Sequence, residues 1–232
     1  MSLDRLREEV LDANLELVRR GLVLYTFGNA SGIDRERGLV AIKPSGVPYE
    51  KMKASDIVIV DLDGKAVEGT LRPSSDLATH LILYKSFPEI GGVVHTHSRY
   101  ATVWAQAGRE IPCLGTTHAD YFYGSIPVTE ILTPAVIAEA YEANTGHAIT
   151  RRFAKIDPLM MPAVLVAGHA PFTWGRSVAE AAHNAVVLEE VAQMALLTFG
   201  LNPAAPPVSQ ALLDKHFLRK HGKGAYYGQP KA

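Results

Sequence analysis

The sequence predicts a single α/β domain, and three observations lead to this prediction. Short apolar segments of strand length occur between longer segments whose apolar residues recur at three- and four-residue steps, the spacing of an amphipathic helix. The two kinds of segment are interleaved along the chain rather than grouped. No internal repeat, low-complexity stretch or domain boundary interrupts residues 1–232, so we expect one domain over that range.

The first half of the chain is expected to contain a long helix, several short strands and a second helix. The first helix begins at Leu3 after the N-cap Ser2, and ends at Arg20 before Gly21. Strand candidates follow at Leu22–Tyr25, Leu39–Ile42 and Asp56–Val60, and a turn at Asp61–Gly64. The second helix opens at Ser74-Ser75-Asp76 and runs to about Phe87.

The second half continues the alternation. A buried strand at Val93-Val94 leads into His95, and further strand character appears at Ala163–Ala167. Helices are expected at Arg99–Ala107, from the Thr133 cap onward, from Ser177 to Phe199 with Glu180 completing a capping box, and at about Val208–Lys220. A polar, glycine-rich tail follows the last helix.

The composition indicates a globular protein with one sizeable core. Of the 232 residues, 47% are hydrophobic, which suffices for one core or two small ones. The net charge of −1 provides no global field toward nucleic acid or an acidic membrane. Cys113 is the only cysteine, so no internal disulfide can form. Residues 1–20 lack a signal-peptide core, and no run approaches the ~20 apolar residues of a membrane span. We therefore expect a cytoplasmic protein.

Three histidines at the ends of predicted strands form a candidate metal site. His95 and His97 follow Val93-Val94, and side chains two apart on a strand point the same way. His169 follows the strand at Ala163–Ala167. Three imidazoles with one open position are typical of a catalytic metal site. The alternative is three unrelated structural histidines. For His80, His147 and His183, on or near helices, a solvated or hydrogen-bonded role is the default.

Three segments rich in small residues form a candidate phosphate site: Gly28–Gly32, Lys43–Gly46 and Pro73–Ser75, all expected to be loops. Glycine permits close backbone approach, and the helix that begins after Ser74-Ser75 favours an anion at its N-terminus. Charge and hydrogen bonds would come from Asn29, Lys43, Ser45, Ser74 and Ser75. The alternative is three ordinary turns with serines that cap helices.

Three residues are candidate proton carriers. Asp76 could act in catalysis, or it could simply lie in the first turn of the helix, where the helix dipole favours a carboxylate. Asp120 lies in an aromatic run, Thr116–Gly124, that could bury it and tune its pKa. Tyr227 lies in the C-terminal tail, which could dock on another subunit.

Taken together, these motifs resemble the class II aldolase family, and in particular its epimerases. The matching segments are Gly28–Ser31, Lys43–Gly46, Pro73–Asp76, Gly91–Ser98, Gly115–Gly124 and Leu213–Gln229. The resemblance extends from about residue 3 to 229. The phosphate loops and the His-x-His motif recur across the wider family, whereas Thr116–Tyr121 and the tail are more particular to the epimerases.

The resemblance implies a fold and a reaction. The fold is a three-layer α/β/α sandwich around a largely antiparallel sheet. The reaction interconverts L-ribulose 5-phosphate and D-xylulose 5-phosphate with Zn2+, or another divalent ion such as Mn2+. The hydrogen on carbon 4 is not adjacent to the carbonyl, so its removal gives no stabilised anion. Cleavage between carbons 3 and 4 gives an enediolate, which a metal stabilises as a Lewis acid. The released glycolaldehyde phosphate rotates and adds back through its other face.

The resemblance also implies a role for each candidate. His95, His97 and His169 would hold the metal, with Asp76 beside it as acid/base or ligand partner. The phosphate would be held by Asn29, Lys43, Ser45, Gly46, Ser74 and Ser75. Asp120 and Tyr227 would carry protons on opposite faces of the aldehyde. The tyrosine, with His216, would come from a neighbouring subunit of a homotetramer, reached by the segment at about 208–232.

One departure and two alternatives remain. Epimerases of this type often have a histidine two residues before the third ligand, where this chain has Ala167, which puts metal affinity in question. One alternative is a class II aldolase that cleaves a ketose 1-phosphate. The other is a non-catalytic interaction module of the same fold. The sequence leaves the pathway open among arabinose, ascorbate and related routes.

Overall fold

The computed structural model describes residues 2–228, so Met1 and residues 229–232, the end of the expected tail, lie outside the described part. The strands are β1 (Asn29–Asp34), β2 (Leu39–Ile42), β3 (Val58–Asp61), β4 (Ala66–Glu68), β5 (Gly92–His95), β6 (Ala163–Leu165) and β7 (Pro171–Gly175). The helices are α1 (Leu3–Arg19), α2 (Leu77–Ser86), α3 (Arg99–Gln106), α4 (Thr116–Ala119), α5 (Pro134–Arg152), α6 (Val178–Leu201) and α7 (Gln210–His221), with 3-10 turns η1 (Tyr49–Lys51) and η2 (Ala54–Asp56).

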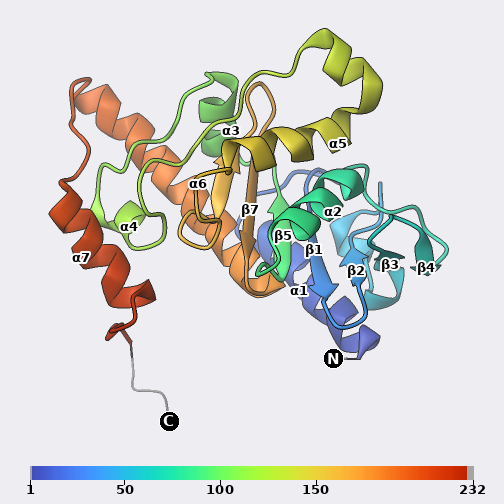
Figure 1. Ribbon diagram of the computed structural model, residues 1–232. Helices are drawn as coiled ribbons and strands as arrows, with labels where there is room; N and C mark the ends of the chain where they lie inside the picture. Colours follow the sequence, from blue (N-terminus) through green and yellow to red (C-terminus); the bar gives the residue numbers. More distant parts are fainter. Residues whose placement is uncertain (1, 229–232) are drawn as a thin grey trace.

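The seven strands form one sheet in the order β4-β3-β2-β1-β5-β7-β6, and every neighbouring pair is antiparallel (Figure 1). The register places Asn29 of β1 opposite His95 of β5, and His95 opposite Phe172 of β7. The prediction of an antiparallel α/β sheet is therefore confirmed, and three strands meet at the position of His95.

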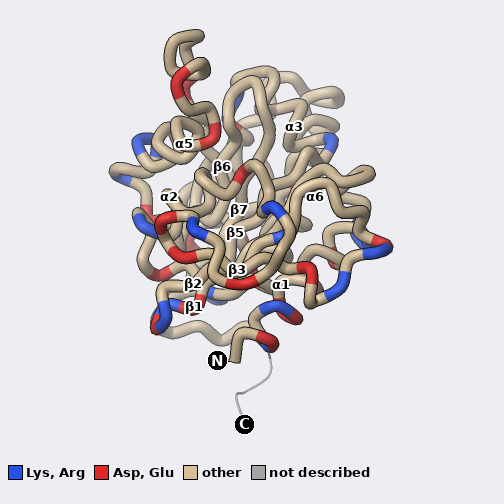
Figure 2. Tube along the Cα trace, turned by 90° about the vertical axis from the view of Figure 1, so that its right-hand side faces the viewer, with Lys and Arg blue, Asp and Glu red and all other residues tan. Residues whose placement is uncertain are grey.

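Helices cover both faces of the sheet, which gives three layers. Figure 2 shows α2 and α5 on one side of the strands, and α1, α3 and α6 on the other. Alternate side chains of β2 follow this division: Val40 and Ile42 pack in the core under α2, whereas Ala41 packs in the core under α1. Acidic and basic residues are interspersed along the trace in Figure 2, as expected for a chain of net charge −1.

Most predicted helices are confirmed with their caps. The side chain of Ser2 accepts a hydrogen bond from the Arg5 N–H at the start of α1, and Thr133 and Ser177 cap α5 and α6 in the same way. Glu180 completes the α6 cap differently from expectation, because its carboxylate accepts from the N–H of Arg176 rather than that of Ser177. Helix α6 also continues through Gly200 to Leu201.

Two segments were predicted wrongly. Residues 29–32, expected to be a glycine-rich loop, belong to the fully buried strand β1. Gly32 serves close packing rather than a turn, because an added Cβ would lie 2.4 Å from Val178 Cγ2 of α6. Leu22–Tyr25, expected to be a strand, is a loop in which only Leu22 is buried and Tyr25 adopts a positive φ of 52°.

Helix α6 is the one helix in residues 2–228 that is long and apolar enough to cross a membrane, contrary to the expectation that no segment would be. Its packing argues for a core helix, since Ala181, Leu188 and Ala192 are buried against the sheet, α1 and α3. Met194 and Leu197, nearer its C-terminal end, are exposed.

Candidate active site

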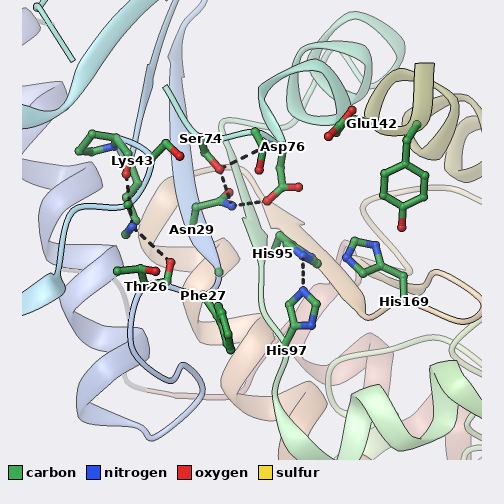
Figure 3. A pocket seen from close by; sticks show the side chains of 16 residues that line it. Thr26, Phe27, Asn29, Lys43, Ser74, Asp76, His95, His97, Glu142 and His169 are labelled. Atoms are coloured by element: carbon green, nitrogen blue, oxygen red, sulfur yellow. Dashed lines mark hydrogen bonds between the residues drawn. The ribbon is translucent and has the colours of Figure 1, made fainter. Parts of the chain in front are cut away.

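One pocket collects both predicted clusters. It has a volume of about 420 Å³ and lies where β1, β5 and the N-terminus of α2 meet. The three histidines, Asp76 and all six predicted phosphate ligands line it: Asn29, Lys43, Ser45, Gly46, Ser74, Ser75, Asp76, His95, His97 and His169. Figure 3 shows Lys43 and the histidines toward opposite sides, with Asn29 and Asp76 between them. Segments more than 100 residues apart in the sequence therefore share one cavity.

The three histidines come from two segments of the chain, the end of β5 and the turn between β6 and β7. His95 is the last residue of β5, and His97 lies just beyond the strand rather than on it. Even so, the Nε2 atoms of His95 and His97 lie 3.2 Å apart. His169 lies in the turn between β6 and β7, and one ring nitrogen from each histidine falls within 4.8 Å of the others. The trio has the spacing of a metal site.

The protonation of these histidines also fits metal binding. Burial lowers the pKa of His95 and of His97 below the ordinary histidine value. Burial, together with the two neighbouring imidazoles, lowers the pKa of His169 to about 4. All three are therefore neutral near pH 7, which is the form that binds a metal. The Nδ1 of His95 lies 2.9 Å from the carbonyl oxygen of Pro171, so this nitrogen carries the proton and Nε2 remains free as a ligand.

Asp76 points into the pocket and does not cap its helix. It occupies the N-cap position of α2, yet its side chain makes no capping hydrogen bond. Instead, Oδ2 accepts a 2.6 Å hydrogen bond from Asn29 Nδ2. Burial would raise the pKa of Asp76, but electrostatic interaction with the nearby His95 and His80 imidazoles and the Asn29 hydrogen bond lower it below the ordinary value. The purely structural interpretation of Asp76 is therefore the weaker one.

The phosphate end is formed by two loops held side by side. The Ser45 N–H donates to the Arg72 carbonyl oxygen, and the Ser74 N–H donates to the Lys43 carbonyl oxygen. Gly46 adopts a φ of +68°, in the region that favours glycine. Ser75 is exposed beside the N-terminus of α2, where backbone N–H groups favour an anion.

Lys43 is a buried cation with only weak partners. It is 2% exposed, and its Nζ donates to the carbonyl oxygens of Pro44 at 3.3 Å and Thr26 at 3.5 Å. The Tyr49 ring lies 4.7 Å below Nζ. Within residues 2–228 no carboxylate forms a salt bridge with it, and burial lowers its pKa. Because a buried charge requires compensation, this end of the pocket is chemically suited to an anion.

Three polar residues of the pocket wall were not predicted from the sequence: Thr26, Tyr141 and Glu142. Tyr141 and Glu142 follow Ala140, where non-helical angles (φ −162°, ψ 76°) interrupt α5. The Tyr141 ring lies 5.8 Å from that of His169. A uniform helical pattern gives no signal for such a break, so only the structure could place these residues.

Asp120, His216 and Tyr227 form a separate cluster, outside the pocket of their own chain. They lie where α4 meets α7, which Figure 1 shows at the edge of the molecule away from β1 and β2. The Asp120 carboxylate accepts from His216 Nδ1 at 3.0 Å and from Arg219 at 2.9 Å. Burial is the largest single effect on the pKa of Asp120 and raises it, as expected, but His216, Arg219 and Lys220 together lower it below the ordinary value.

The departure at Ala167 has a counterpart in the structure. His169 Nδ1 is buried and has no hydrogen-bond partner among residues 2–228, and the Ala167 side chain offers none. The backbone N–H of Ala167 donates to Thr129 Oγ1 instead. Since the second nitrogen of a metal-ligating histidine is usually hydrogen-bonded, His169 lacks the orienting contact that the Pro171 carbonyl oxygen gives to His95.

The pattern of the class II aldolase and adducin N-terminal domain matches residues 8–196. The chain therefore belongs to the class II aldolase family. Over 227 residues it is 57% identical to the L-ribulose-5-phosphate 4-epimerase UlaF of Salmonella paratyphi B and to that of Salmonella typhi, a match that covers 98% of this chain and 100% of each relative.

Solved structures agree on the fold. An L-fuculose 1-phosphate aldolase superposes with a TM-score of 0.80 at 26% identity, over 91% of this chain and 94% of the aldolase. YgbL of Klebsiella pneumoniae superposes with a TM-score of 0.74 at 25% identity, over 93% of this chain and 99% of YgbL. The predicted three-layer architecture is therefore confirmed.

Proposed function

We propose that this chain is a zinc-dependent L-ribulose-5-phosphate 4-epimerase. The observation that carries the proposal is the single pocket in which the three imidazoles lie on one side of Asp76 and a proposed anion-binding group lies on the other (Figure 3). We call this group, formed by Lys43, Ser45, Ser74 and Ser75, the anion seat. The near full-length similarity to epimerases of that name supports the choice of L-ribulose 5-phosphate and D-xylulose 5-phosphate as substrates.

The anion seat would hold the phosphate throughout the reaction. Lys43 supplies the charge, and Ser45, Ser74 and Ser75 supply hydrogen bonds near the start of α2. The proposed mechanism cleaves the bond between carbons 3 and 4 and then turns the resulting aldehyde. The phosphate must stay anchored during this turn, because a released aldehyde would convert the enzyme into an aldolase.

His95, His97 and His169 would hold the metal, with one coordination position left for substrate. A divalent ion bound there supplies Lewis-acid stabilisation of negative charge on the three-carbon fragment. Three neutral imidazoles suit zinc and also accept manganese. Asp76, whose lowered pKa keeps it ionised, lies beside them and would orient the substrate hydroxyls.

Two proton carriers are needed, because the hydroxyl on carbon 4 changes side. We assign them to Asp120 and Tyr227. One would remove the hydroxyl proton as the carbon–carbon bond breaks, and the other would return a proton to the aldehyde oxygen after it has turned. Their distance from the pocket of their own chain supports a site completed by a neighbouring subunit, with His216 in the same cluster. This arrangement requires an assembly, which we propose is a homotetramer.

We further propose that the enzyme acts in the cytoplasm on a free sugar phosphate, with no nucleic acid or membrane partner. The interspersed charges and the single free cysteine are consistent with that setting.

The experiment that tests the proposal is proton NMR of L-ribulose 5-phosphate incubated with zinc-loaded protein. We expect signals of D-xylulose 5-phosphate to grow. Accumulation of dihydroxyacetone and glycolaldehyde phosphate would instead identify an aldolase. No reaction of this substrate, with metal confirmed in the protein, would overturn the epimerase assignment and direct the test to ketose 1-phosphates. Purified protein that neither contains nor responds to zinc or manganese would favour a non-catalytic module.

Subunit sharing has its own test. His97→Asn removes a metal ligand, and Tyr227→Phe removes a proton carrier, so each variant alone should be inactive. When the two are unfolded and refolded together, mixed assemblies contain sites with an intact metal trio and an intact tyrosine from the neighbour. Activity restored by mixing supports the shared site. Mixtures as inactive as the separate variants would place all the machinery within one chain.

A further inference from the structure

A buried row of three hydrogen-bonding side chains lies beneath Asp76. His80 and Tyr84 are on successive turns of α2, and Ser31 is on β1; all three side chains are fully buried. Ser31 Oγ lies 2.7 Å from His80 Nδ1 and 2.8 Å from the Tyr84 hydroxyl. None of the three lines the pocket. The row therefore has no direct role in the site described above.

The hydrogen bonds of this row determine where His80 carries its proton. Within residues 2–228 the Tyr84 hydroxyl has one hydrogen-bonding side-chain partner, Ser31. If Tyr84 donates to Ser31, then Ser31 donates to His80 Nδ1, and the histidine proton lies on Nε2. The reverse direction would leave the Tyr84 O–H buried without an acceptor, a cost of about 1–3 kcal/mol. The first arrangement is favoured, and it makes Nε2 a donor.

The Nε2 donor is buried and lacks a partner. No hydrogen bond to it occurs in residues 2–228, although its atom is inaccessible to solvent. Phe172 packs edge-on against the His80 ring at 6.0 Å and stacks on His95 at 4.2 Å, so the histidine lies one layer behind the metal trio. A buried donor without an acceptor costs free energy and is rarely retained without a use.

The nearest charged group on the same helix is Asp76, one turn before His80. Residues four apart on a helix lie on the same face. The carboxylate is close enough that its charge raises the pKa of His80, but burial has the larger, opposite effect and brings that pKa to about 3. His80 is therefore neutral in the working pH range, and its N–H acts as a fixed dipole rather than as a switch.

We propose that His80 is a positioning residue for Asp76, whose carboxylate it orients through an Nε2–H fixed by the Tyr84–Ser31 row, and to which it hydrogen-bonds when substrate fills the pocket. Hydrogen bonds of this kind are often long before substrate binds and shorten in the complex. The inference rests on the proposed function, because Asp76 needs an orientation only if the pocket is an active site.

Two substitutions separate the two nitrogens of His80. His80→Asn keeps a polar atom near the position of Nδ1, so Ser31 retains a partner, but the distal donor is lost. His80→Gln places an amide N–H near the position of Nε2. We expect His80→Asn to lower kcat about 10- to 100-fold, the usual effect of losing a group that orients a site residue, with KM little changed. His80→Gln should recover most of that loss. His147→Asn, an exposed histidine on α5, is the control and should match wild type.

The tautomer is measured independently of activity, by long-range proton–nitrogen NMR of histidine-labelled wild-type protein. A protonated Nε2 on His80 supports the proposal, and a protonated Nδ1 overturns it. It is also overturned if His80→Asn and His80→Gln fold and show the same kcat. The two proposals fail differently: wild type without epimerase activity refutes the epimerase, whereas active wild type with an active His80→Asn refutes only the role of His80.

Discussion

Replacing Lys43 with methionine tests the anion seat most directly. Lys43 is 2% exposed, and its two carbonyl contacts of 3.3 and 3.5 Å are long for an ammonium group. Methionine has nearly the same length and no charge, so the substitution removes the cation while filling the same space against Tyr49.

Lys43→Met is expected to weaken substrate binding without destabilising the folded protein. A hydrogen bond to a charged group is worth about 1.5–3 kcal/mol, which corresponds to a roughly 10- to 150-fold rise in KM for the phosphorylated substrate. The folded protein itself should lose nothing, because a poorly compensated buried charge is removed. We therefore expect weaker substrate binding together with an unchanged or higher Tm.

Steady-state kinetics and thermal unfolding with and without inorganic phosphate provide the assay. Phosphate bound to the folded state raises Tm by mass action, and Lys43→Met should lose most of that rise. Lys51→Met, an exposed lysine on η1, is the matched control. An unchanged KM together with a full phosphate response in Lys43→Met would refute the assignment of the anion seat.

Three further predictions concern catalysis, pH and packing. Asp120→Asn should depress epimerisation by a factor of ~100 or more while metal analysis finds the ion still bound; full turnover would remove Asp120 from the mechanism. Burial lowers the pKa of His118 to about 4, so it stays neutral in the fold while the unfolded chain takes up a proton near pH 6.5. The metal-free protein should therefore lose up to about 3 kcal/mol from this group as pH falls from about 6.5 to 4, and His118→Gln should flatten that dependence in denaturant titrations. Gly32→Ala should cost about 1–3 kcal/mol, because its Cβ would lie 2.4 Å from Val178 Cγ2, whereas Gly200→Ala on α6 meets nothing within 4 Å and should not lower Tm.

Residues 29–32 show where sequence reasoning about the fold failed. Asparagine, serine and glycine around a single alanine form a composition typical of a loop. In the structure this segment is the strand on which the pocket is built. Gly32 admits α1 and α6, Ser31 bonds His80, and Asn29 bonds Asp76. The polar residues lie in a strand because their partners are on α2, and those partners are invisible to local pattern.

The candidate metal and phosphate residues were easier to find from the sequence, because few residue types can bind a metal or a phosphate. All ten residues predicted for metal, phosphate and Asp76 line one pocket. Glu142 and Tyr141 escaped prediction, since a helix break at Ala140 brings them there.

The sequence by itself determined the alternation of helices and strands, most helix caps and which residues would line the candidate site. Those depend on local hydrogen bonding, on apolar spacing and on the few side chains able to bind a metal or a phosphate. Tertiary structure alone decided that β1 is central, that Asp76 faces Asn29, and that His80 is buried behind the histidine trio. It also decided that Asp120 and Tyr227 lie apart from the pocket of their own chain. These relations join residues tens of positions apart through packing across a sheet, and no local pattern encodes such a contact.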